Sequence, residues 1–147
     1  MFSKKILTAF IFFLIFIGVF LFFNQPREIK GVVIGGKTFF VEVARTKSEL
    51  EKGLSLHAPL LDDRGMLFIF TNEDFHGFWM KDMLFPIDIV WIDSNLVVIN
   101  LEKNVLPEDY PKIFRPETKS LYVLEVSAGQ TSLLKIDVGD KVEFVKK

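Results

Sequence analysis

Residues 65–93 read GMLFIFTNEDFHGFWMKDMLFPIDIVWID, and they contain two apolar runs on either side of a polar and aromatic loop. Met66–Phe70 is a continuous apolar run, which is typical of a strand buried on both faces. Thr71–Asp74 interrupt this run, and a second apolar run, Ile87–Ile92, follows a turn near Pro86. The stretch therefore predicts two core strands joined by a loop.

Charged side chains lie between the aromatic residues of this loop. Lys81 and Asp82 directly follow Phe78–Met80, and Asp88 comes after the turn at Pro86. A lysine and carboxylates beside buried rings are costly unless they are paired or solvated in a cleft. The arrangement therefore indicates either a structural ion pair or a binding site.

Several motifs resemble the domain-of-unknown-function 192 family. They are GMLF from Gly65, FWMKD from Phe78, P-I-D from Pro86, and YVLE from Tyr122 followed by AG, and they occur in the order and spacing of that family. The resemblance covers roughly Lys30–Val145. It implies a compact, mostly antiparallel β domain of prokaryotic origin that is often exported and has no established activity.

The chain departs from the family pattern at four positions. Asp82 and Met83 stand where the family usually has Asn and Thr, and Ser55 and His57 replace its usual Met and Arg. If the family shares a ligand, the polar contacts of this chain with it are expected to differ.

Composition limits the chain to one domain. It has 147 residues, of which 50% are hydrophobic, and we assign residues 1–27 to a membrane anchor with a short linker and residues 28–147 to a single globular β-rich domain. From Glu28 onward, 15 basic residues face 19 acidic ones, so a nucleic-acid partner is not expected. The absence of cysteine excludes disulfides, thiolate nucleophiles and sulfur-ligated metals.

The N-terminal segment Ile6–Phe23 contains no charge and predicts a single transmembrane helix. Its length as a helix would be about 27 Å, close to the hydrocarbon thickness of a bilayer. No A-x-A-like cleavage site follows it, which favours an uncleaved anchor over a signal peptide; a buried helix of a soluble protein is the other alternative. Lys4 and Lys5 precede it, so we expect the globular domain outside the cytoplasm at the cell membrane.

The rest of the chain predicts a mostly β (α+β) fold, a compact antiparallel sheet or barrel-like domain with one or two short helices behind the transmembrane helix. Gly35 and Gly36 suit a hairpin turn, and Thr46 with Glu49 forms a capping box that begins a short helix. Glu102–Ser120, with three prolines, predicts a long loop, and Ser127–Ile136 a turn or a single helical turn. The remaining predicted strands are Ile29–Ile34, Lys37–Ala44, Leu96–Leu101, Leu121–Val126 and Lys141–Val145.

A candidate ligand site follows from the central loop. Trp79 and Lys81 share a face if the strand continues through them, and the turn at Pro86 can bring Asp88 back toward them, so we expect Lys81, Asp82 and Asp88 to converge beside Trp79. A salt bridge that stabilises the turn is the alternative. The candidate ligand-binding residues are Trp79, Lys81, Asp82, Asp88, His76 and Glu125.

Other chemistry has weaker support. His76 lies near Glu73 and Asp74 but lacks metal-ligand spacing, so no metal and no cofactor are predicted, and no catalytic residue can be assigned. His57 and most of the aromatic rings are expected in or near the core.

Three functions therefore remain open. An aromatic wall beside a cation and carboxylates favours a binding module for a sugar-like or anionic small molecule, which predicts an open cleft. A carboxylate-dependent hydrolase would need two convergent carboxylates, one of them with a raised pKa. A tethered protein-interaction domain predicts an exposed apolar patch and no cleft.

Overall fold

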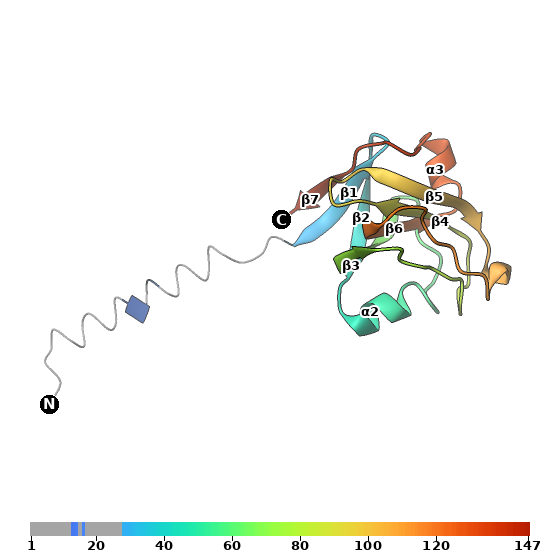
Figure 1. The fold of residues 1–147 in the computed structure, drawn as a ribbon, viewed down its shortest axis with the longest axis horizontal. Helices are drawn as coiled ribbons and strands as arrows, with labels where there is room; N and C mark the ends of the chain where they lie inside the picture. The colour runs from blue at the N-terminus through green and yellow to red at the C-terminus, as the bar shows by residue number, and fades with distance from the viewer. Residues whose placement is uncertain (1–12, 15, 17–27) are drawn as a thin grey trace, which may run out of the picture.

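The computed structural model of the protein describes residues 13, 14, 16 and 28–147. Residues 28–147 form one seven-stranded sheet with two short helices and one 3₁₀ turn (Figure 1). In chain order the elements are β1 Ile29–Ile34, β2 Lys37–Ala44, α2 Lys47–Lys52, β3 Arg64–Asp74, β4 Ile87–Ile92, β5 Val98–Val105, η1 Pro107–Asp109, β6 Ser120–Ser127, α3 Gln130–Leu133 and β7 Glu143–Lys146. The predicted mostly β fold with short helices agrees with this architecture.

The strands follow the order β5-β4-β6-β3-β2-β1-β7, and five of the six pairings are antiparallel. The exception is β2 with β3, which pair in parallel because the crossover through α2 returns the chain to the same end of the sheet. The two edges of the sheet approach each other at a bridge between Val97 and Lys141, and Val98 N–H donates to Asp140 O at 2.9 Å. The sheet is therefore curved into a barrel-like form.

Strand alternation divides the core into two clusters. Met66 and Phe68 face one side of β3, whereas Leu67 faces the other, and every residue of β4 is buried. The barrel-side cluster lies inside the curve and consists of Ile29, Val32, Ile34, Phe39, Leu67, Val90, Ile92, Val98, Leu124, Val126, Ile136 and Val142. The helix-side cluster lies on the opposite face and consists of Ala44, Leu54, Met66, Phe68, Met80, Met83, Phe85, Ile87, Ile89, Trp91, Val105, Phe114 and Val123.

The predicted transmembrane helix is a correction to the fold assignment. In the described part of the chain, no helix is long and apolar enough to cross a membrane. A span requires about 20 residues, whereas α2 has six and α3 has four. Most of the predicted segment Ile6–Phe23 lies outside the described residues. The expected placement of the domain outside the cytoplasm stays a prediction.

Two strands are longer than their apolar runs. Thr71–Asp74 were expected to end a strand, but β3 continues through them and Asp74 pairs with Ser120. Likewise β5 extends to Val105, a residue of the segment predicted as a proline-rich loop, and Val105 pairs with Ile87 of β4. In β3, pairing resumes at Asp74 after a register shift that follows Ile69, and in β5 it reaches Val105, so the hydrophobic pattern alone places both strand ends too early.

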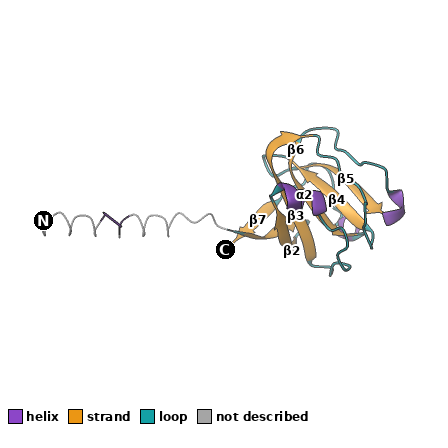
Figure 2. Ribbon diagram, turned by 90° about the horizontal axis from the view of Figure 1, so that it is seen from below, coloured by secondary structure: helices purple, strands orange, loops and turns teal. Residues whose placement is uncertain are grey.

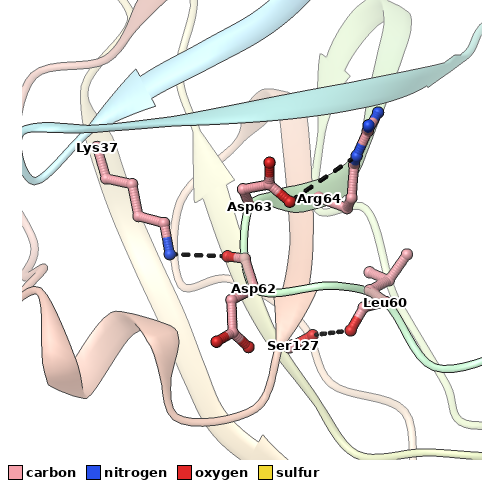
Figure 3. Close-up of polar contacts among 6 residues, drawn as sticks. All are labelled: Lys37, Leu60, Asp62, Asp63, Arg64 and Ser127. Carbon is pink, nitrogen blue, oxygen red and sulfur yellow. Dashed lines mark hydrogen bonds and ion pairs between the residues drawn. The ribbon is translucent and has the colours of Figure 1, made fainter.

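Hydrogen bonds and an ion pair hold the segment between α2 and β3 (Figure 3). Ser127 Oγ donates to Leu60 O at 3.0 Å, and Lys37 Nζ donates to Asp62 O at 2.8 Å. Asp63 and Arg64 form an ion pair of 3.8 Å at the start of β3. These contacts tie the crossover to β6 and β2, and α2 is thereby kept over the helix-side cluster.

Gly65 is required where β3 passes β6. A Cβ at this position would lie 2.7 Å from the backbone oxygen of Glu125, a distance that only a backbone shift can relieve. We expect Gly65→Ala to lower the free energy of unfolding by about 2–3 kcal/mol, measured by urea denaturation. Gly36→Asn is the control, because a Cβ there meets nothing within 4 Å and Asn tolerates its φ of +76°. Equal stability of Gly65→Ala and the wild-type protein would contradict this reasoning.

Candidate functional site

A cavity of about 600 Å³ lies between α2, the end of β3 and the loop that follows it, and we call it the α2 cavity. Figure 2, seen from below, shows α2 in front of the sheet. The cavity is lined by Arg45, Lys47, Leu50, Glu51, Lys52, Gly53, Leu54, Ser55, Phe68, Phe70, Thr71, Asn72, Asp74, His76, Gly77, Phe78, Trp79, Met83 and Glu125. Its lining thus combines aromatic walls, charged residues near α2 and one residue of β6.

The helix wall forms because its sequence starts and ends a helix clearly. The Thr46 side chain accepts a hydrogen bond from Glu49 N–H, and the Glu49 carboxylate accepts one from Thr46 N–H, so the predicted capping box is present. Leu50 and Leu54 pack on the helix-side cluster. Gly53 ends the helix with a φ of 48°, a conformation that glycine adopts without strain.

The opposite wall is a set of aromatic rings in edge-to-face and stacked contact. Phe78 meets Phe68 edge-on with ring centroids 4.8 Å apart, and it also meets Trp91 at 6.0 Å. His76 stacks on Phe70 at 3.4 Å. Trp91 Nε1–H donates to the backbone oxygen of His76 at 2.8 Å. The buried Trp91 therefore fixes the loop that carries His76, Phe78 and Trp79.

Glu125 is the buried acid of the cavity. It lies on β6, where its backbone pairs with Met66 of β3 and Ile89 of β4, so its side chain points to the helix-side face together with theirs. Only 4% of the residue is exposed, and its Oε2 has no hydrogen-bond partner in the described part of the chain. Burial raises the pKa of Glu125 to about 8. A carboxyl group in this state is protonated at neutral pH and can donate a hydrogen bond.

The charged residues of the cavity other than Glu125 lie on its exposed rim. Arg45, Lys47 and Lys52 stand on and beside α2, and Glu51 is an ion-pair partner of Lys47 at 3.8 Å. Asp74 is exposed on the β3 side, and its Oδ1 accepts a hydrogen bond from Phe75 N–H. Solvent screens these groups, whereas Glu125 is withdrawn from solvent.

Asp88 does not line the α2 cavity, so the predicted convergence of Lys81, Asp82 and Asp88 beside Trp79 is not observed. It is fully buried on the barrel side of β4, the face that also carries Val90 and Ile92. Its Oδ1 accepts from Asn104 N–H at 2.8 Å and Gly129 N–H at 3.1 Å, and its Oδ2 accepts from Thr131 N–H at 2.9 Å and Thr131 Oγ–H at 2.7 Å. Asp88 is therefore a structural carboxylate that joins β4, β5 and the first turn of α3.

Lys81 and Asp82 lie outside the lining of the α2 cavity. Both are exposed, and neither forms an ion pair within residues 28–147. Their backbone oxygens accept hydrogen bonds from Ser55 Oγ and Leu56 N–H, so this loop is joined to the chain after α2. Asp82 has a φ of 57°, which shows that the chain is already turning there. The strand alternation assumed for Trp79 and Lys81 does not hold.

Of the six predicted ligand-binding residues, the cavity brings together Trp79, His76 and Glu125 and leaves out the other three. The sequence reasoning missed the contribution of α2, including Leu50 and Lys52, and of Arg45 just before it. The capping box and the apolar spacing of Leu50 and Leu54 predicted a helix on the sheet, but they carried no signal that a hollow lies beneath it.

Sequence comparison finds two matches. The DUF192 family model, described as "Uncharacterized ACR", matches residues 31–144. UPF0127 protein PYRAB11210 of Pyrococcus abyssi (strain GE5 / Orsay) is 32% identical over 124 residues, which cover 81% of this chain and 95% of that protein.

Solved structures with similar folds include the following two. A protein of unknown function from Novosphingobium aromaticivorans has a TM-score of 0.75 and 33% identity, with 82% of this chain and 88% of that chain covered. A putative transcription regulator (R01717) from Sinorhizobium meliloti 1021 has a TM-score of 0.74 and 28% identity, with 82% and 97% covered.

Proposed function

We propose that this chain, which belongs to the uncharacterised DUF192 family as its motifs predicted, binds a small organic molecule in the α2 cavity. The family description gives no activity, so the proposal rests on the cavity itself. A volume of about 600 Å³ is within the range of small-ligand sites, which are mainly apolar with a few well-placed polar groups.

The observation that carries the proposal is Glu125. A buried polar group without a partner costs free energy, and natural proteins retain few of them. Here the unpartnered oxygen belongs to a residue that lines an open cavity. A ligand with a hydrogen-bonding group would satisfy it, and its apolar body would contact Phe68, Phe78 and Leu54.

The two alternative functions receive less support. A carboxylate-dependent hydrolase needs a second acid that converges on Glu125, but Asp88 lies on the barrel side and Asp74 is exposed at the rim. An anionic ligand held by Lys81 is not favoured, because Lys81 does not line the cavity. A protein-interaction surface would not account for the hollow.

A neutral aromatic alcohol tests the proposal, because it carries one hydrogen-bonding group on an apolar body. We expect tryptophol to cause saturable amide shift changes in the ¹H–¹⁵N spectrum at residues of α2, β3 and β6. Thr71→Trp places a large ring on an exposed lining position and should abolish these changes.

Glu143→Trp is the matched control for the blocking variant. Position 143 is an exposed strand residue on β7 that does not line the cavity, so this variant should bind tryptophol as the wild-type protein does. Shift changes that fail to saturate, or that persist in Thr71→Trp, would refute small-molecule binding in the α2 cavity.

A further inference from the structure

The α2 cavity has an uneven distribution of charge. Its only buried ionisable side chain is Glu125, among the residues the structure describes as lining it. Around that acid the cavity is built from rings and aliphatic side chains, chiefly Phe68, Phe78 and Leu54. Every cation of the lining, namely Arg45, Lys47 and Lys52, belongs to the exposed region on and next to α2.

We infer that the ligand carries a protonated amine, which pairs with the carboxylate of Glu125 while its apolar body lies against the aromatic rings of the cavity. This inference rests on the proposed binding function and names the class of ligand. An ammonium group would supply the hydrogen-bond partner that Glu125 Oε2 lacks within the described part of the chain.

The chemistry favours a cation over a neutral or anionic group. A carboxylate withdrawn from water binds a cation strongly, because the low local dielectric strengthens the attraction and the hydrogen bond is charge-assisted. The faces of Phe and Trp rings also attract cations. An anionic group at this depth would meet either a like charge or a single donor hydrogen, with the protein's cations held at the rim.

The proton balance of binding follows directly. The unliganded carboxyl holds a proton at neutral pH, and pairing with an ammonium group requires the carboxylate. Binding therefore transfers one proton from Glu125 to solvent, and no covalent bond of the ligand changes. The other titratable groups that line the cavity are His76, Asp74, Glu51 and the three rim cations.

Three probes with one indole ring separate the possibilities: tryptamine is cationic, tryptophol is neutral and indole-3-propionate is anionic. We expect tryptamine to bind the full-length wild-type chain about 30-fold more tightly than tryptophol at pH 7.5, measured by isothermal titration calorimetry. In buffers of different ionisation enthalpy, tryptamine binding should release about one proton, and tryptophol binding none.

The pH dependence of binding gives a second test. The affinity for tryptamine should rise about tenfold per pH unit between pH 6 and pH 7.5 and level off near pH 8, because the ionised fraction of Glu125 rises in this way. The affinity for tryptophol should stay flat. In Glu125→Gln the preference for tryptamine and its pH dependence should both disappear, while tryptophol still binds.

The outcomes separate this inference from the proposed function. Equal binding of tryptamine and tryptophol, or tightest binding of indole-3-propionate, would refute the amine while leaving a small-molecule site in place. A preference for tryptamine that survives in Glu125→Gln would also refute it. If none of the three probes binds, both the inference and the proposed function fail.

Discussion

Asp88→Ala is expected to lower the free energy of unfolding by about 4 kcal/mol, the largest single loss that we predict. The substitution removes a fully buried carboxylate and leaves four donors without an acceptor: the N–H groups of Asn104, Gly129 and Thr131, and the Thr131 hydroxyl. The two Thr131 donors are buried, and each costs about 1–3 kcal/mol when it is left unsatisfied, whereas the partly buried N–H groups of Asn104 and Gly129 can bond to water and cost less. Urea denaturation of the full-length chain, followed by circular dichroism, measures the change.

Two further variants serve as a control and as a test of the hydrogen bond between Thr131 and Asp88. Asp62→Ala removes an exposed acid whose carboxylate forms no hydrogen bond or ion pair with the other residues drawn in Figure 3, and it should change stability by no more than about 0.5 kcal/mol. Thr131→Val removes one of the four donors and should cost about 1–2 kcal/mol alone but much less in the Asp88→Ala background. A loss below about 1 kcal/mol for Asp88→Ala would show that this carboxylate does not hold β4, β5 and α3 together.

The same aspartate shows how far sequence reasoning reached. Strand alternation along β4 puts Asp88 on the opposite face from Ile87 and Ile89, which the expected convergence with Lys81 did not take into account. What alternation cannot supply is which face lies inside the curve of the sheet. That depends on the bridge between Val97 and Lys141, two positions more than forty residues apart in the chain. It also depends on α3, whose Thr131 donates two hydrogen bonds to Asp88.

The candidate site was likewise predictable only in part. The aromatic loop and Glu125 belong to short motifs, so the sequence alone was enough to select them as candidates. Whether they meet depends on pairings between segments far apart in the chain, such as Met66 with Glu125, and on the docking of α2. Lys81 was misplaced for a local reason, because a turn with positive φ at Asp82 ends the alternation. A non-glycine residue in that conformation is uncommon, although Asp is one of the residue types enriched in it.

The buried acid has a consequence for stability that can be measured without any ligand. We expect the free energy of unfolding of the wild-type chain to fall by about 3 kcal/mol between pH 5 and pH 7.5. The pKa of Glu125 is raised by burial from 4.5 to about 8, so over this range the folded protein keeps a proton that the unfolded chain releases. The stabilisation is complete below the unfolded pKa and is lost as the pH rises toward the folded pKa, by about 1.4 kcal/mol per pH unit.

Glu125→Gln isolates this effect, because glutamine keeps the size of the side chain and does not titrate. Both histidines are present in both proteins, so the difference between the two stability curves reports Glu125 alone. Other shifted groups act elsewhere: a side-chain hydrogen bond from Lys30 lowers the pKa of Glu28, and backbone hydrogen bonds lower that of Glu49. The stabilisation that these two groups provide has the opposite pH dependence: it is present above the unfolded pKa and is lost only below about pH 4.5. We therefore expect the Glu125→Gln curve to be nearly flat from pH 5 to pH 7.5, whereas parallel curves would mean that Glu125 ionises freely in the folded protein.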